Sequence, residues 1–195
     1  MYNNDEFIKI IKDRLSEKRF QHSLNVAASA KELAKKFGAD EEKAYTAGIL
    51  HDIMKEENID IQLEYIEKNG EDTEKLKFAN TQIYHQMSGA AYCKLELGMD
   101  DEDVLGAIRY HTTGRRDMAL LEKIVYTADF ISADRCYPDV DVMREKASKS
   151  LDEAILYSLR YTISDLSKRA KPIHIDTVEC YNDLLENFKE KDLEL

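Results

Sequence analysis

The chain has 195 residues, of which 43% are hydrophobic and 34% charged, so it suits one domain with a packed core and excludes global disorder. Its formal net charge of −11 repels a phosphate backbone, which argues against nucleic acid as a partner bound through a broad basic face. With only seven glycines and two prolines, the sequence lacks the turn residues of a sandwich, barrel or Rossmann-type sheet and predicts an all-α fold.

Apolar residues recur at helical spacing along almost the whole chain, and no segment alternates as a strand does. Gly38 is expected to end the second helix and Asp40 to cap the third, while Asp100 and Asp117 are the predicted N-caps of two later helices. No internal repeat or flexible linker is visible, so we expect one compact helical domain over residues 1–195. The predicted helices cover residues 7–15, 17–37, 41–54, 60–68, 83–97, 101–111, 118–135, 141–149, 150–170 and 176–191.

The cysteines and the apolar segments both bear on the cellular compartment. Cys93, Cys136 and Cys180 are far apart and show no zinc-binding spacing, which is typical of free thiols in a reducing cytosol. The N-terminus has no uninterrupted apolar segment, and no stretch approaches the roughly 20 apolar residues that a membrane span needs. We therefore expect a cytoplasmic protein with no membrane partner.

A histidine–aspartate pair at positions 51 and 52 is the first candidate for chemistry. It follows the small, apolar segment AYTAGIL, which predicts burial, and a buried carboxylate is costly unless it is paired, hydrogen-bonded or bound to metal. The pair alone also fits a packed core imidazole beside a hydrogen-bonded carboxylate. His22 on the preceding antiparallel helix can face this pair, and Asp129 lies in a third apolar helix. Two imidazoles and two carboxylates suit iron, manganese, cobalt or nickel better than a structural zinc.

Six segments carry a family resemblance. They are RFQHSLNVAASAKELA, AGILHDIMKE, YHQMSGA, AIRYHTTG, IVYTADFISADRCYP and PIHIDTVE, within about residues 14–182. They resemble the HD-domain metal-dependent phosphohydrolases, and among these the YqeK-type bacterial branch. The resemblance implies a single compact HD-domain helical bundle with helical extensions at both ends. It also implies symmetrical cleavage of diadenosine tetraphosphate, a dinucleoside polyphosphate, into two ADP. Two segments depart from the family pattern, Pro138-Asp139-Val140 and Ile173-His174-Ile175-Asp176, and the second bears on the shape of the nucleotide pocket.

The resemblance assigns metal binding and catalysis to His22, His51, Asp52 and Asp129. A bound metal would lower the pKa of a water molecule, and the resulting hydroxide would attack phosphorus in line. Iron is the first expectation, with manganese, cobalt, nickel or magnesium as alternatives. One or two ions are compatible with the motif, since His85 and His111 could hold a second metal or only contact phosphate.

Further residues are candidate substrate contacts. Arg19, Lys55 and Arg135 lie near the proposed ligands in sequence and are expected to bind phosphate oxygens, although each also suits an ordinary surface cation. Asp134, beside Arg135, is expected to orient a side chain. The remaining contacts are His85, His111 and Thr112 for phosphate and, on resemblance, His174 and Thr177 for the edge of the nucleotide.

Several functions remain open at the level of sequence. One alternative is an HD phosphohydrolase for another nucleotide, such as a deoxynucleotide or a cyclic dinucleotide, with an ADP- or GDP-like product. A second is a nucleotide-binding regulatory module without turnover, and a third is a helical scaffold without a site. A homodimer is compatible with the eleven tyrosines.

Overall fold

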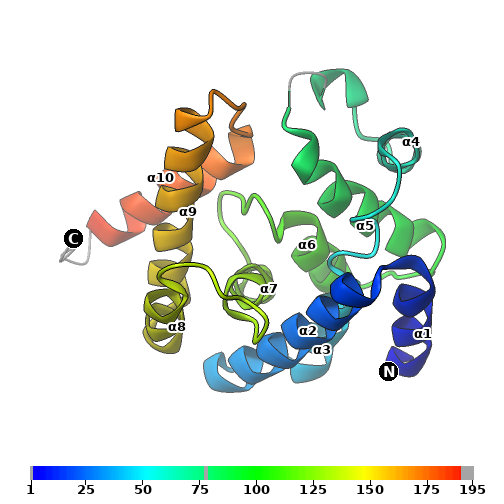
Figure 1. Cartoon of the computed structure of the whole chain (residues 1–195), viewed down its shortest axis with the longest axis horizontal. Coiled ribbons are helices and arrows are strands. Elements are labelled where there is room, and N and C mark those ends of the chain that lie inside the picture. The colour runs from blue at the N-terminus through cyan, green and yellow to red at the C-terminus, as the bar shows by residue number, and fades with distance from the viewer. Residues whose placement is uncertain (1, 77–78, 190–195) are drawn as a thin grey trace.

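The computed structural model describes residues 2–76 and 79–189, and within these ranges it is built from helices without a strand (Figure 1). The all-α prediction is confirmed. In chain order the α-helices are α1 (Asn4–Arg14), α2 (Glu17–Phe37), α3 (Glu41–Leu50), α4 (Ile59–Lys68), α5 (Tyr84–Leu95), α6 (Glu102–Tyr110), α7 (Leu120–Ile131), α8 (Val140–Lys149), α9 (Leu151–Lys168) and α10 (Ile175–Lys189). Two short 3₁₀ helices, η1 (Thr73–Leu76) and η2 (Thr81–Ile83), lie between α4 and α5. The predicted end of the last helix, at residue 191, lies outside the described residues.

Helices α2 and α3 form a tight antiparallel pair. Gly38 ends α2 in the left-handed conformation, with φ 77°, and Asp40 caps α3 by accepting hydrogen bonds from two backbone N–H groups, as predicted. Gly48 on α3 lies directly against α2, because a Cβ built there would lie 2.5 Å from Cα of Ala27. This close approach brings the start of α2 to the end of α3, where His22 and His51 lie.

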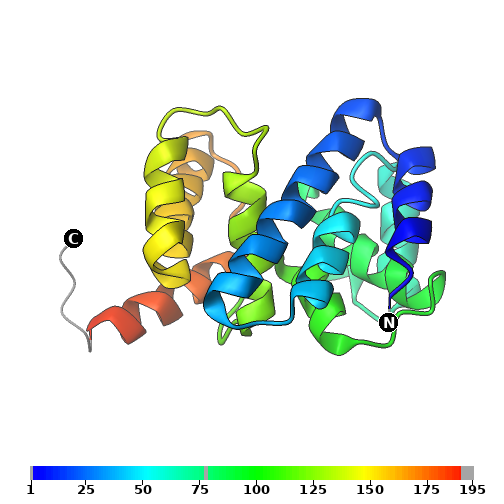
Figure 2. The same ribbon diagram turned by 90° about the horizontal axis from the view of Figure 1, so that it is seen from below.

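Helix α7 occupies the middle of the molecule. In Figure 1 it is viewed nearly end-on, with α8, α9 and α10 on one side and α2, α3 and α6 on the other. Figure 2, which looks at the same ribbon from below, shows α8 and α9 side by side, well separated from α1 and α4. One buried apolar cluster joins α1, α2, α3, α5, α6 and α7, and a second joins α7 to α9 and α10. Because α7 belongs to both clusters, apolar packing on two sides of this helix positions Asp129 near its C-terminal end.

The helix that carries His51 is shorter than predicted. It ends at Leu50, and residues 51–56 continue as turns rather than as a helix to residue 54. The backbone hydrogen bonds tighten there, since Ile53 N–H donates to Leu50 O and Lys55 N–H to Asp52 O. His51 and Asp52 therefore lie at the helix end and not within it.

Two predicted N-caps are wrong. Asp101, not Asp100, caps α6, because its carboxylate accepts from two N–H groups of the first turn while the Tyr2 hydroxyl and the Lys43 ammonium bind the same carboxylate. Asp117 has a positive φ of 53° and does not cap α7, which begins at Leu120. There Glu122 reaches back and accepts a hydrogen bond from the N–H of residue 119. The sequence offers several adjacent acidic residues, and only long-range contacts choose among them.

The predicted helix 118–135 also ends early, at Ile131. Ser132 is extended, with ψ 154°, and residues 132–139 form a loop that turns back toward α2. All three cysteines are free, and Cys136 of this loop is exposed while the other two are buried. No helix in the described part of the chain has the length and apolar character needed to cross a bilayer.

Candidate metal centre

His51 and Asp52, at the C-terminal end of α3, form the buried floor of the site. They are 0% and 2% exposed. His51 Nδ1 lies 2.8 Å from Gly48 O, and since a carbonyl can only accept, Nδ1 carries the hydrogen. The other ring nitrogen, Nε2, therefore presents a lone pair. It is buried without a hydrogen-bond partner among the described residues and lies 3.4 Å from Asp52 Oδ2.

His22 faces this floor from α2, and both of its ring nitrogens have carboxylate partners. Its Nδ1 lies 2.8 Å from Asp134 Oδ2, and a carboxylate accepts the hydrogen there. Its Nε2 lies 2.9 Å from Asp129 Oδ1, near the end of α7. The rings of His22 and His51 meet edge to face, with centroids 5.5 Å apart. Each ring nitrogen of His22 thus faces a carboxylate.

His111, the residue that follows α6, completes the pattern. Its Nδ1 donates to Ile108 O at 2.8 Å, so its Nε2 is also a lone-pair atom. That Nε2 lies 3.6 Å from Asp52 Oδ1 and 3.0 Å from Nε2 of His85, which begins α5. His85 Nε2 lies 3.2 Å from the same Oδ1. None of these approaches to Oδ1 has hydrogen-bond geometry, and the oxygen is buried without such a bond.

This donor set fits a divalent metal. Nitrogen lone pairs that face carboxylate oxygens repel one another unless a cation lies between them, and an imidazole that donates Nδ1–H to an oxygen is the usual form of a histidine ligand. Two sets of three residues each place one donor atom per residue within 4.8 Å of the others in the set. The first set is His22, His51 and Asp129, and the second is His51, Asp52 and His111. The four ligands expected from sequence are all included, and His111 joins them.

The electrostatics of the two aspartates agree with a cation site. Burial opposes ionisation of Asp52 and Asp129, but neighbouring histidines outweigh it at both and hold each pKa well below the usual range. Arg135 contributes to the same effect at Asp129. The pKa of His51 is raised although burial lowers it, because Asp52 and Asp129 favour a positive charge there. The site therefore holds two ionised carboxylates, one buried and one partly buried, that favour a cation.

Two arginines expected to bind phosphate lie beside the ligand carboxylates. Arg19 Nη1 is 2.7 Å from Asp52 Oδ2, and its side chain is 29% exposed. Arg135 Nη2 binds Asp129 Oδ1, and its Nε donates to the backbone oxygen of Asp129 at 2.7 Å. Each guanidinium binds one buried carboxylate and still reaches solvent, where it could meet an anionic substrate.

The remaining expected phosphate contacts gather around His85. Lys55 Nζ lies 3.1 Å and Thr112 Oγ1 3.3 Å from His85 Nε2. Burial and the Lys55 ammonium lower the pKa of His85 to about 3, so its ring is neutral near pH 7. Burial also lowers the pKa of Lys55. A neutral His85 has one ring nitrogen with a lone pair, which can accept from the lysine or bind a metal.

His174 and Thr177 are not brought into this cluster. They lie at the start of α10, where Thr177 N–H donates to His174 O at 3.1 Å and His174 Nδ1 lies 3.4 Å from Asp176 Oδ2. Among the described residues, no hydrogen bond or ion pair joins either residue to the four expected ligands. Their assignment to the edge of the nucleotide stays a prediction.

Sequence reasoning missed Gln86. It is fully buried, and its Oε1 accepts hydrogen bonds from Thr112 N–H at 2.9 Å and Thr113 N–H at 3.2 Å. Its Nε2 donates to Thr113 Oγ1 at 3.0 Å. One side chain thus shapes the turn that follows His111. The available signal was a polar residue on the buried side of a helix, next to His85, but its partners are distant in sequence.

Known proteins resemble this chain in sequence and in structure. The HD domain family model matches residues 19–134. The chain is 40% identical to "Bis(5'-nucleosyl)-tetraphosphatase, symmetrical" of Halalkalibacterium halodurans, over 94% of this chain and 97% of that protein. It is 38% identical to the protein of the same name from Bacillus subtilis, over 92% and 96%. A solved structure from Clostridium acetobutylicum, described as a predicted HD superfamily hydrolase involved in NAD metabolism, superposes with a TM-score of 0.91 at 36% identity, covering 96% of this chain and 99% of that one.

These matches cover most of the chain, and the HD model includes all four expected ligands. The divalent metal that the HD domain implies agrees with the buried donor set. The chain therefore belongs to the HD domain family of metal-dependent phosphohydrolases.

Proposed function

We propose that this protein hydrolyses diadenosine tetraphosphate symmetrically to two ADP. Two relatives at 38–40% identity, each covered almost completely, carry the name of this activity, which supports the assignment. The reaction consumes one water molecule. The bond between the second phosphorus and its bridging oxygen breaks, the oxygen of water replaces it, and the bridging oxygen stays with the other ADP.

The observation that carries the proposal is the meeting of imidazole lone pairs with carboxylate oxygens in one buried site. We assign His22, His51, Asp52 and Asp129 as metal ligands. Their mixed nitrogen and oxygen donors suit iron first, with manganese, cobalt, nickel and magnesium as alternatives. His85 Nε2 and His111 Nε2 lie 3.2 Å and 3.6 Å from Asp52 Oδ1, which supports these three residues as ligands of a second ion.

When bound, a divalent cation lowers the pKa of a coordinated water and neutralises charge on phosphoryl oxygens. The chain's own residues then bind and orient the phosphates. The side chains of Arg19 and Arg135 are 29% and 35% exposed, and each guanidinium binds a different ligand carboxylate. Guanidinium groups bind phosphate through paired N–H donors, so the two can hold phosphoryl oxygens on either side of the reacting phosphorus. Lys55 and the Thr112 hydroxyl add donors beside His85.

Product analysis tests the proposal. Purified protein is stripped with a chelator, reloaded separately with iron, manganese, cobalt, nickel or magnesium, and incubated with diadenosine tetraphosphate. ADP as the sole nucleotide product is expected for at least one metal. AMP with ATP would instead indicate asymmetric cleavage, and absence of turnover with every metal would refute the proposed substrate.

Variants distinguish the loss of a metal ligand from the loss of a carboxylate elsewhere in the protein. Asp129→Asn and His51→Ala should lose most of the bound metal in elemental analysis and most of the ADP formation. Asp101→Asn serves as the matched control, because Asp101 is an N-cap of α6 and takes no part in the site. Turnover of deoxynucleotides or cyclic dinucleotides by the same preparation, without turnover of diadenosine tetraphosphate, would assign the site to another substrate.

A further inference from the structure

The loop between α7 and α8, residues 132–139, supplies two groups to the metal centre. Asp134 accepts the Nδ1 hydrogen of His22, and Arg135 binds Asp129. Ala133, Asp134, Cys136, Pro138 and Asp139 are exposed, and the apolar packing of the loop comes from Tyr137, which lies against the buried cluster of Met143, Ala147 and Ala154. The segment around Asp134 and Arg135 therefore depends on polar contacts.

One side chain from outside the loop binds three backbone carbonyls at this place. Arg144, on the first turns of α8, donates from Nε to Ile131 O at 3.2 Å and from Nη2 to Ser132 O at 3.2 Å and Arg135 O at 3.1 Å. These carbonyls lie immediately before and within the loop. The Tyr137 hydroxyl donates to Phe130 O at 2.9 Å, and Asn25 Nδ2 donates to Asp134 Oδ1 at 3.1 Å.

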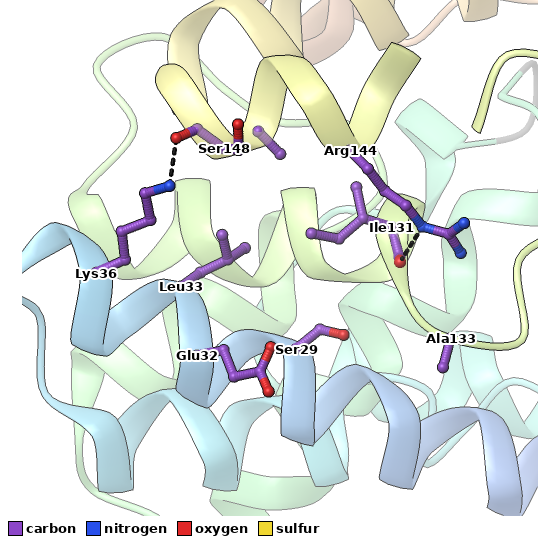
Figure 3. A pocket seen from close by; sticks show the side chains of 9 residues that line it. Ser29, Glu32, Leu33, Lys36, Ile131, Ala133, Arg144 and Ser148 are labelled. Carbon is purple, nitrogen blue, oxygen red and sulfur yellow. Dashed lines mark hydrogen bonds between the residues drawn. The ribbon is translucent and has the colours of Figure 1, made fainter. Parts of the chain in front are cut away.

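A groove lies beside the loop, and the Arg144 side chain lines it. Figure 3 shows this cavity, of about 420 Å³, between α2, the end of α7 and α8, with Arg144 reaching the carbonyl of Ile131. At the other end of the groove Lys36 donates to Ser148 O, which ties α8 to α2 without touching the loop. Removal of the Arg144 guanidinium would leave the carbonyls of Ser132 and Arg135 without this side-chain donor, at the side of the loop that faces the groove.

We propose that Arg144 is a positioning residue of the metal centre, which holds the loop so that Asp134 orients the His22 ring and Arg135 stays on Asp129. This inference rests on the proposed function only for its effect on turnover. Groups that orient a metal ligand through its second nitrogen typically change metal affinity about 10- to 100-fold when they are removed. A residue that only capped the carbonyls at the end of α7 would change stability and leave metal affinity unchanged.

The test measures Mn²⁺ affinity of the full chain by competition with a chelator, together with kcat and KM for diadenosine tetraphosphate. Arg144→Gln should bind Mn²⁺ about 10-fold more weakly and lower kcat, with KM within about twofold of the wild-type value. Lys36→Gln is the matched control, a cation of the same groove bound to the same helix, and should keep the wild-type affinity. Arg144→Lys retains a charge and one donor group and should recover part of the loss.

Coupling to Asp134 distinguishes positioning from general destabilisation. If Arg144 acts through the loop, the double variant Arg144→Gln, Asp134→Asn should lose less Mn²⁺ affinity than the sum of the losses in the two single variants. Additive losses in the two variants would overturn the proposal, as would wild-type Mn²⁺ affinity in Arg144→Gln. If Arg144→Gln does not fold, the same coupling is measured with Arg144→Lys. Mn²⁺ binding is measured without turnover. The affinities therefore test the role of Arg144 even if the protein does not hydrolyse diadenosine tetraphosphate.

Discussion

At Gly48 a single added methyl group should destabilise the packing of α2 against α3. A Cβ at this position would lie 2.5 Å from Ala27 Cα and 2.9 Å from Ala27 N. Carbon atoms in contact normally lie about 3.5–4.0 Å apart. The obstructing atoms are backbone atoms of a buried helix, so no side-chain rotation relieves the clash. In Gly48→Ala the two helices must therefore separate by about 1 Å at this point.

The expected cost follows from two opposing effects. Overpacking of a core costs about 1–3 kcal/mol, and backbone obstruction places this site at the upper end of that range. Alanine is better than glycine within a helix by about 1 kcal/mol. The net loss in the free energy of unfolding is then about 2 kcal/mol, which for a chain of this size lowers Tm by about 4–8 °C. Separation of the helices also moves His22 away from His51.

Gly89→Ala is the matched control. This glycine is also buried in a helix, but a Cβ there meets nothing closer than 3.5 Å, which is ordinary contact. It should be neutral or stabilising by up to about 1 kcal/mol. Thermal and urea unfolding of the chelator-treated proteins measure both variants. Equal stability of Gly48→Ala and Gly89→Ala would refute the claim that close approach of α2 and α3 demands glycine.

Three further predictions concern other parts of the molecule. Gln86→Met keeps the shape but leaves the N–H of Thr112 and the buried N–H of Thr113 without this partner, so urea unfolding should show a loss of about 2 kcal/mol or more; unchanged stability would contradict the proposed role of the amide. At Asp101 hydrogen bonds from Tyr2 and Lys43 outweigh burial and lower the pKa to about 2. Its charged form therefore stabilises the fold above about pH 4, and this contribution is lost as the pH falls toward 2. Asp101→Asn should be less stable at pH 6, with a difference that closes between pH 4 and 2 in Tm measurements; a constant difference would count against it. Chelation of the metal should lower Tm, and reloading at about 100 times Kd should restore about 2.7 kcal/mol; identical Tm values would mean that no metal binds the folded state.

Local sequence signals were enough for most of the fold. A left-handed glycine and a short acidic cap act within one turn of chain, so Gly38 and Asp40 could be placed without knowledge of any distant contact. The two misplaced caps failed for the opposite reason. At the start of α6 neighbouring acidic residues compete, and Tyr2 and Lys43, far away in sequence, select Asp101. The early end of α7 similarly depends on Arg144 from the next helix.

The candidate site divides in the same way. The histidine–aspartate pair, with a histidine and an aspartate on other predicted helices, made His22, His51, Asp52 and Asp129 candidates from sequence, and the resemblance to the HD-domain phosphohydrolases assigned them as ligands. Their supporting groups were not identifiable, because Gln86 and Arg144 act on backbone atoms that no side-chain pattern reveals. Sequence alone therefore determined an acidic helical chain with a metal-binding motif. Only the tertiary structure decided which lone pairs meet, since hydrogen bonds to Gly48, Ile108 and Asp134 set the direction of each imidazole.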